Sequence, residues 1–469
     1  MGIETLDSLN NYYNNYLEKK LINKRFKHSE ILPLIEFHKS AKELNITLVG
    51  HSIEGREIFS IEYGKGQTIV LMWSQMHGDE PTATMALFDL INFLTLNDQL
   101  NQLRNEINEN LKLIMIPMLN PDGAEKIIRY NALGIDLNRD ARVLQSPESK
   151  ILIDLVDKYQ PDFAFNLHDQ DFRWSVGSGN NLAAISLLAP VFDNTKTINN
   201  SRSRAIRLIA DLRKDFELYL PGKIARYKDD FEPRSFGDTI AGKNSSTILI
   251  ETGRDIYDPN KLFYRKITFL MLISAFSKII DRTYEKFNYD EYFEIPSNGK
   301  FLYDLILRNV SVSHTHKPIV VDIAINREED YELFSRNPKF VSCIMEIGDL
   351  STTYGIEEFD CTGLTLSEGK ITQDGLTKLS DLNIEKINNF LNNGILFLKK
   401  VDLENYSSRF TSFPINIIKE ESNYIPGVEI NKPANFNLTL DGKLVKQVIN
   451  GWFCEPGKTE RVTNGLIFY

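Results

Sequence analysis

The stretch IVLMWSQMHGDEPTATMALFDLINFL, residues 69–94, joins two kinds of local structure. Its first part, IVLMWSQM, is a continuous apolar run typical of a buried strand, and its last part, PTATMALFDLINFL, is typical of a helix. Between them Gly78 allows a tight turn, and Pro81 suits the first turn of a helix. The junction therefore puts His77 and Glu80 at the carboxyl end of a strand, where open α/β sheets carry their binding sites.

The His-x-x-Glu spacing of these two residues is not specific by itself. The chain has 64 acidic residues and seven histidines among 469 residues, so about one such pair is expected by chance. His51 and Glu54 form a second pair with the same spacing, but no sharp strand end precedes it. The strand end before His77 is what favours His77 and Glu80 as candidate metal ligands.

The first half of the chain alternates short apolar runs with helix-like stretches, which predicts βαβ units. We expect an α/β fold with a mixed, largely parallel sheet and helices on both faces. The predicted strands are 57–63, 68–75, 111–118, 162–168 and 246–252. The predicted helices are 82–97, 148–160, 199–220 and 259–284.

A second domain is expected after the turn or linker Pro296-Ser297-Asn298-Gly299, because 469 residues exceed one typical domain. Beyond this turn, short β-type runs are separated by turns, with one helical stretch near 383–393. The sequence thus predicts a larger domain over residues 1–295 and a smaller, mostly β domain over residues 300–469.

Composition narrows the classes of protein to consider. Hydrophobic residues make up 42% of the chain and charged residues 25%, which is typical of a globular protein, and the net charge is −10. Without a basic stripe we expect no nucleic-acid partner, and without a long apolar run we expect no membrane span. The N-terminus lacks the pattern of a signal peptide, so we expect a cytoplasmic protein, or a periplasmic or secreted one if an export signal has been removed.

The three cysteines, Cys343, Cys361 and Cys454, are far apart in the sequence. Their odd number and wide spacing indicate buried free thiols, not a disulfide framework or a cysteine-rich zinc site.

Two further residues end apolar runs and could complete a catalytic site. His168 closes DFAFNLH, and together with His77 and Glu80 it would supply the His₂Glu ligand set of a catalytic zinc. Glu251 closes TILIE, where a carboxylate is costly unless it is paired or functional. Glu251 is therefore a candidate general base; a helix cap or an ion pair with Arg254 is the alternative.

Several motifs follow one another in a fixed order. HGDE is followed by Asn120-Pro121-Asp122-Gly123, Arg129, the run GIDLNR, the strand ending in His168 and the strand ending in Glu251. This order resembles that of the metallocarboxypeptidases of the carboxypeptidase A family, in its bacterial branch. The resemblance covers about the first 280 residues and leaves out the C-terminal domain.

The resemblance implies one zinc ion and a role for each matched residue. His77, Glu80 and His168 resemble the zinc ligands, and Asp136 is similar to the carboxylate that orients a zinc histidine. Glu251 resembles the general base. The remaining matches concern the substrate: Arg129 would polarise the scissile carbonyl, and Asn138, Arg139 and the family's mobile tyrosine, at Tyr227, would bind the terminal residue.

Two departures from the family pattern concern the substrate. Asp79 stands where digestive members carry arginine immediately before the ligand glutamate, which favours a different, more basic peptide segment. The segment around Tyr227 does not align cleanly, so Arg234 is an alternative contributor there.

We therefore predict a zinc-dependent metallocarboxypeptidase that hydrolyses the C-terminal peptide bond of peptides with a free terminal carboxylate, with water activated by zinc and Glu251. One alternative is a zinc-dependent deacylase or amidase of the same superfamily, acting on an acyl amino acid or a cell-wall peptide. Another is a non-catalytic zinc-containing protein that binds peptides.

Overall fold

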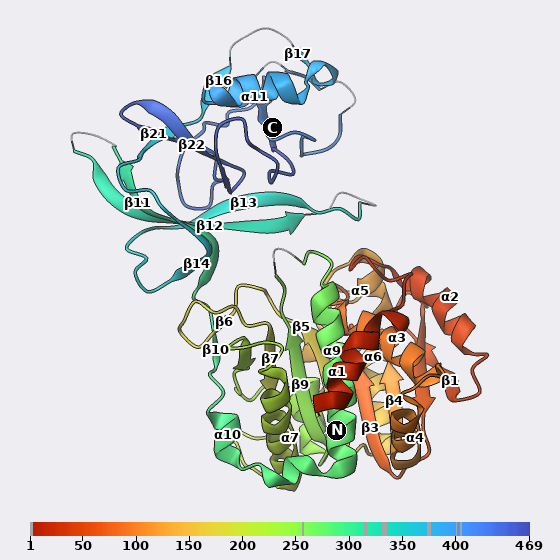
Figure 1. The fold of residues 1–469 in the computed structure, drawn as a ribbon. Coiled ribbons are helices and arrows are strands. Elements are labelled where there is room, and N and C mark those ends of the chain that lie inside the picture. Colours follow the sequence, from red (N-terminus) through yellow and green to blue (C-terminus); the bar gives the residue numbers. More distant parts are fainter. Residues whose placement is uncertain are drawn as a thin grey trace. The chain divides into compact units, whose positions relative to one another are not determined.

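The computed structural model describes residues 3–255, 258–313, 317–330, 335–372, 377–399, 401–403 and 406–469. The chain forms two compact units, Met1–Lys300 and Phe301–Tyr469 (Figure 1).

The first unit is built on an eight-stranded sheet with the strand order β1-β2-β4-β3-β5-β9-β7-β8. Its four central strands, β4, β3, β5 and β9, are parallel to one another, and antiparallel pairs join β1 to β2, β2 to β4 and β7 to β9. The mixed, largely parallel sheet predicted from the sequence is confirmed. The strands are β1 (Leu44–His51), β2 (Glu57–Tyr63), β3 (Thr68–Trp73), β4 (Leu111–Ile116), β5 (Phe163–Asp169), β7 (Ile185–Leu188), β8 (Ile224–Arg226) and β9 (Ser246–Thr252).

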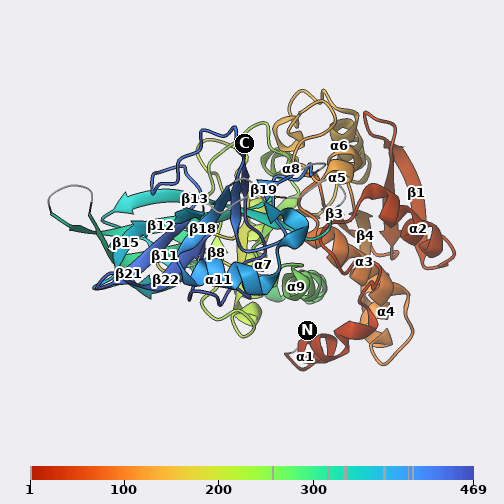
Figure 2. The same cartoon turned by 90° about the horizontal axis from the view of Figure 1, so that it is seen from above.

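Helices cover both faces of this sheet, because alternate strand residues point to opposite sides. In β3, Val70 and Met72 pack into one hydrophobic cluster with α3, α7 and α9, whereas Leu71 and Trp73 pack into another with α6 and α8. Figure 2 shows α6 and α8 on one side of β3 and β4, and α3 and α9 on the other. The helices of the unit are α1 (Ile3–Tyr12), α2 (His28–His38), α3 (Thr82–Thr95), α4 (Asn101–Asn110), α5 (Pro121–Lys126), α6 (Pro147–Tyr159), α7 (Asn200–Phe216), α8 (Phe236–Gly242), α9 (Leu262–Asp281) and α10 (Tyr289–Phe293), with 3₁₀ turns η1 (Tyr13–Asn15), η2 (Leu137–Arg139) and η3 (Thr283–Lys286).

The stretch 296–299, predicted as a turn or linker, belongs to the first unit and is hydrogen-bonded to other segments of it. Within it, β10 (Asn298–Gly299) pairs with β6 (Ser175–Val176). The N–H groups of Arg226 and Gly177 donate to the carbonyls of Pro296 and Ser297, both at 2.8 Å. These four residues therefore help to hold β6 and the last residue of β8 in place.

The second unit is rich in β-structure, as predicted. One sheet has the order β13-β12-β11-β15-β21-β22-β23, with β14 paired to β11, and a second has the order β16-β18-β20-β24. The predicted helix near 383–393 is α11 (Ile384–Asn392), preceded by η4 (Leu379–Asp381). The strands are β11 (Leu302–Val312), β12 (Ile319–Asp330), β13 (Lys339–Gly348), β14 (Tyr354–Asp360), β15 (Thr365–Glu368), β16 (Lys370–Thr372), β17 (Thr377–Lys378), β18 (Ile395–Lys399), β19 (Val401–Asp402), β20 (Asn416–Ile418), β21 (Phe436–Leu440), β22 (Lys443–Ile449), β23 (Trp452–Cys454) and β24 (Ile467–Phe468).

The cysteines lie in this unit and all three are free thiols. Only Cys361 is fully buried, whereas Cys343 and Cys454 are partly exposed, so the prediction of burial is wrong for those two. Within the described residues, no helix combines the length and the apolar composition that crossing a membrane requires.

Candidate metal centre and active site

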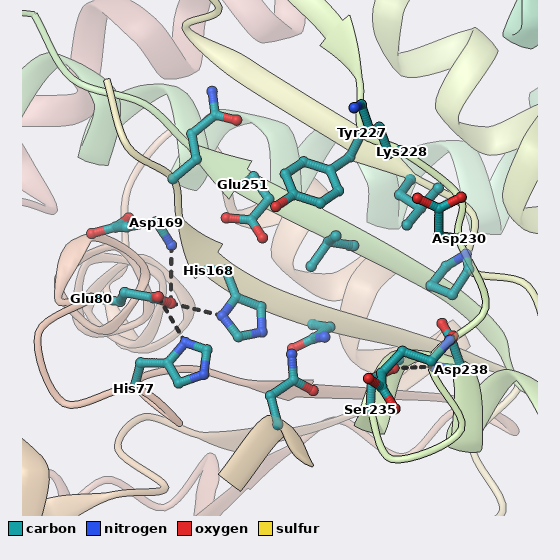
Figure 3. Close-up of a pocket in the computed structure, with 18 of the residues that line it drawn as sticks. His77, Glu80, His168, Asp169, Tyr227, Lys228, Asp230, Ser235, Asp238 and Glu251 are labelled. Atoms are coloured by element: carbon teal, nitrogen blue, oxygen red, sulfur yellow. Dashed lines mark hydrogen bonds and ion pairs between the residues drawn. The ribbon is translucent and has the colours of Figure 1, made fainter. Parts of the chain in front are cut away.

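Three side chains converge at the carboxyl edge of the central sheet. His77 follows β3, His168 lies near the end of the neighbouring strand β5, and Glu80 lies in the turn that leads into α3. The Nδ1 atoms of His77 and His168 are each 2.7 Å from one oxygen of the Glu80 carboxylate (Figure 3). One ligand atom from each residue lies within 4.8 Å of the others, and no other such group occurs among the residues that the structure describes.

This set of donor atoms fits a zinc ion. Two imidazole nitrogens and a carboxylate oxygen are the ligands of a common catalytic zinc site, in which a fourth position is left to water or substrate. The three side chains are 3%, 2% and 11% exposed for His77, His168 and Glu80. A carboxylate this deeply buried needs a compensating positive charge, which a divalent cation would provide.

Asp136 lies behind His77. Its Oδ1 is 3.1 Å from Nε2 of His77, which leaves Nδ1 facing Glu80. The same carboxylate accepts two hydrogen bonds from Arg129, from Nε at 3.1 Å and Nη2 at 3.0 Å. Burial opposes ionisation, but the hydrogen bond from His77 and the charges of His77 and Arg129 hold the pKa of Asp136 well below its usual range. An ionised carboxylate here can fix the tautomer and orientation of a ligand histidine.

Glu251 lies beside His168 because the two residues are opposite each other in the register of the parallel strands β5 and β9. Burial, and then the charge of Glu80, raise the pKa of Glu251 to about 8. A carboxyl group that resists losing its proton to solvent can both accept and return a proton during a reaction.

Tyr227 follows β8, and its ring points toward Glu251 (Figure 3). Burial and then the charge of Glu251 raise the pKa of Tyr227 above its usual value, so the phenol stays protonated at neutral pH. Arg234, the alternative considered for this segment, does not line the cavity described below. Its guanidinium is 56% exposed and lies 2.8 Å from the Glu232 carboxylate.

A cavity of about 470 Å³ lies in front of these residues. The three candidate metal ligands line part of this cavity, and hydrogen-bonding and charged side chains also line it. Its lining includes His77, Glu80, Arg129, Asn138, Arg139, His168, Tyr227, Asp230, Glu232, Asp238 and Glu251. Asp79 is exposed and is not among the lining residues, so its side chain faces solvent next to the site.

Arg129 and Arg139 are the two guanidinium groups of this cavity. Nη1 of Arg129 lies 3.5 Å from the Glu80 carboxylate, close to the metal ligands. Arg139 is 41% exposed, donates from Nη1 to the carbonyl of Asn138 at 2.6 Å, and lies 3.6 Å from Glu232. The Asn138 side chain is oriented by the N–H of Phe236, which donates to its Oδ1 at 3.0 Å.

Sequence reasoning missed some of the residues at the site. Asp238, in the first turn of α8, lines the cavity and is buried, which raises its pKa to about 6. Asp169 and Lys261 form a buried ion pair next to His168. Asp169 could have been noticed in the sequence because it directly follows a candidate ligand. Its contact with Lys261 could not, because Lys261 lies 92 residues later in the chain.

The second His-x-x-Glu pair behaves as a surface feature. His51 is exposed at the end of β1. Glu54 lies within 2.7 Å of Lys126 and also contacts Arg56. Glu54 thus forms ion pairs with neighbouring basic side chains.

Comparison with known proteins finds similarity to zinc carboxypeptidases. Residues 33–180 match the Peptidase_M14 family model, described as zinc carboxypeptidase, and this span holds His77, Glu80 and His168. Carboxypeptidase D of Rattus norvegicus is 31% identical over 140 residues, which are 26% of this chain and 10% of that protein. Carboxypeptidase SOL1 of Arabidopsis thaliana is 34% identical over 98 residues, which are 20% of each. The chain thus spans only a tenth to a fifth of the length of these curated relatives.

Solved structures with similar folds include a metallo-carboxypeptidase from Burkholderia cenocepacia. It is 16% identical with a TM-score of 0.46, and the match covers 55% of this chain and 70% of that one. A metallo-carboxypeptidase from Pseudomonas aeruginosa is 20% identical with a TM-score of 0.45, covering 55% and 69%.

Proposed function

We propose that this chain, which belongs to the Peptidase M14 zinc carboxypeptidase family through residues 33–180, removes the terminal residue from peptides with a free C-terminal carboxylate. One observation carries the proposal. A metal-ligand triad, a carboxyl group suited to proton transfer and a group able to bind a terminal carboxylate all face the same cavity. A binding protein without catalysis would not require Glu251 at that position.

The zinc ion would be held by His77, Glu80 and His168. When bound, it supplies a Lewis acid that lowers the pKa of water and polarises a carbonyl group. The chain's own residues do the rest. Asp136 keeps His77 in the tautomer that presents Nδ1, and it holds Arg129 with two hydrogen bonds so that Nη1 stays near the ligands. Arg129 can then stabilise negative charge that develops on the scissile carbonyl oxygen.

Glu251 is the proton carrier in this proposal. It accepts the proton of the attacking water and returns it to the leaving amine. Its place opposite His168 in the register of β5 and β9, in the lining of the same cavity, supports this role.

The substrate would be anchored by Arg139 and Asn138. A guanidinium binds a carboxylate with two parallel hydrogen bonds, and the hydrogen bond from the Phe236 N–H fixes the orientation of the Asn138 amide beside it. Tyr227, which lines the same cavity with a protonated hydroxyl, would donate to the bound peptide.

An amidase or deacylase of the same superfamily is the second candidate. The observation that favours it is the position of Glu232, whose carboxylate lies 3.6 Å from Arg139 and competes with a substrate carboxylate for that guanidinium. Such an enzyme would act on an acyl amino acid or a cell-wall peptide and would not depend on a free terminus.

Mass spectrometry of a peptide panel tests the proposal, with each sequence supplied with a free and an amidated C-terminus and the zinc content of the protein measured in parallel. We expect stepwise loss of terminal residues from the free peptides only. Equal hydrolysis of both forms would support the amidase, and a zinc-loaded protein that cleaves neither form nor acyl amino acids would overturn both candidates.

A further inference from the structure

A buried ion pair lies next to the metal ligands, and one of its members, Asp169, is also in the lining of the cavity. The ammonium of Lys261 is 3.0 Å from Oδ2 of Asp169, and the two side chains are 8% and 6% exposed. Asp169 follows His168 in β5, and Lys261 precedes the first residue of α9. No catalytic step assigned above uses either residue.

Asp169 contacts the metal site through its backbone and through its side chain. Its N–H donates to Oε2 of Glu80 at 3.2 Å. Figure 3 draws this hydrogen bond as a dashed line. Its carboxylate accepts a hydrogen bond from the hydroxyl of Thr82 at 2.8 Å and a longer one from the Thr82 N–H at 3.4 Å. Thr82 is fully buried and begins α3, two residues after Glu80. Asp169 thus connects β5, which carries the ligand His168, to the start of α3, which follows the ligand Glu80.

Lys261 supplies the positive charge that this arrangement requires. Asp169 lies near the carboxylate of Glu80, and like charges repel strongly where water is excluded. Among the ion pairs of the described residues, Lys261 is the only cation partner of Asp169. A buried carboxylate that loses its only cationic partner is left as an uncompensated charge, which favours turning it away from Thr82 and Glu80.

We propose that Lys261 and Asp169 are positioning residues for the metal centre, with Lys261 acting through Asp169 to hold Glu80 and His168 in ligand geometry. This inference rests on the proposed zinc site at His77, Glu80 and His168. It assigns the pair no contact with substrate. A merely structural role would change the stability of the fold and leave zinc affinity unchanged.

Zinc affinity of the full chain, measured by competition with a chromophoric chelator, tests the pair. For Lys261→Met we expect the dissociation constant of zinc to rise about 10–100-fold, the range found for groups that orient metal ligands. The double variant Lys261→Met with Asp169→Asn removes the uncompensated charge and keeps an oxygen acceptor for Thr82, so we expect it to regain most of the lost affinity. Lys243→Met removes the lysine of an exposed pair with Asp157, at 2.7 Å, and should leave zinc binding unchanged.

The possible outcomes distinguish a failure of the positioning role from a failure of the proposed function. A wild-type chain that does not bind zinc would contradict the proposed function itself. A wild-type chain that binds zinc, with Lys261→Met equal to it in affinity or only less stable to heat, would overturn the positioning role. Should Lys261→Met fail to fold, Asp169→Asn decides: we expect weaker zinc binding, and unchanged affinity in that variant overturns the inference.

Discussion

Arg139 is the cavity residue whose role depends most on the substrate being a peptide with a free carboxylate. Hydrogen bonds to charged groups are worth about 1.5–3 kcal/mol, so Arg139→Ala should lower kcat/KM by about 10–100-fold, mainly through a higher KM. Arg142→Ala is a matched control, because Arg142 is exposed three residues later. Steady-state kinetics on one free peptide would measure both variants. Unchanged kcat/KM in Arg139→Ala would show that the substrate is held in another way.

Asp238 makes the stability of the fold depend on pH. Burial raises its pKa to about 6 from an ordinary 3.8, so the folded chain holds a proton that the unfolded chain has released. The stabilisation is complete below pH 3.8 and is lost as the pH rises through about 6. This change corresponds to at most about 3 kcal/mol.

The Asp238→Asn variant removes this pH-dependent contribution of Asp238 to the stability of the fold. Thermal denaturation from pH 4 to pH 8 should show wild type losing stability relative to the variant as the pH rises, with little difference at pH 4. Parallel curves for the two proteins across this range would contradict the assignment.

At the scale of single residues, the sequence was informative where a residue ended an apolar strand. His77, His168 and Glu251 all stood out in this way, and the structure brings them together. Asp238 and Lys261 could not be found by the same reasoning. Neither ends an apolar run, and each matters through contacts made only when distant segments fold together.

The turn between β3 and α3 is packed against the backbone of α5, which explains why it contains glycine. A Cβ at Gly78 would lie 2.0 Å from the carbonyl carbon of Gly123 and 2.2 Å from the N of Ala124. Backbone atoms cannot move aside as a flexible side chain can. Two motifs noted in the sequence, HGDE and the Asn-Pro-Asp-Gly turn, are therefore in direct contact.

Gly78→Ala should separate these two elements and displace His77 and Glu80. We expect a loss of at least about 3 kcal/mol of stability together with reduced zinc content. Gly242→Ala, whose new Cβ would meet Phe192 at an ordinary 3.6 Å, should retain both properties. Thermal denaturation and metal analysis of the two variants provide the comparison, and a stable, zinc-loaded Gly78→Ala would be contrary to the geometry.

Some strands of the first sheet were easier to predict from the sequence than others. The central parallel strands were predicted closely because they are continuous apolar runs buried on both faces. The strands at the edges of the sheet were missed: β1 exposes many of its residues, and β8 has only three. Since β8 leads into Tyr227, the position of that tyrosine depends on an element too short to be recognised in the sequence.

At the scale of the whole molecule, the first unit should fold and function by itself. Its two large hydrophobic clusters take their described members from residues 6–295. We expect residues 1–300 to bind one zinc ion and to cleave the same peptides as the full chain. Residues 1–295 form the matched comparison, since they lack β10 and the carbonyls of Pro296 and Ser297 that support the chain next to Tyr227.

The shorter fragment should be less stable and less active than the longer one, as measured by thermal denaturation and peptide hydrolysis. If residues 1–300 were unfolded or inactive, the catalytic site would require the second unit, and the separation into a catalytic and an accessory domain would be wrong.

Zinc and Glu251 are proposed to activate water in one cavity. The most direct measurement of this step is the zinc content and the peptide hydrolysis of Glu251→Gln, determined on the same preparation. Because Glu251 is not among the three ligand residues, the variant should retain one zinc ion per chain. Its kcat should fall by about 10²–10⁴-fold, the usual contribution of a general base. Wild-type turnover by the zinc-loaded variant would contradict the account.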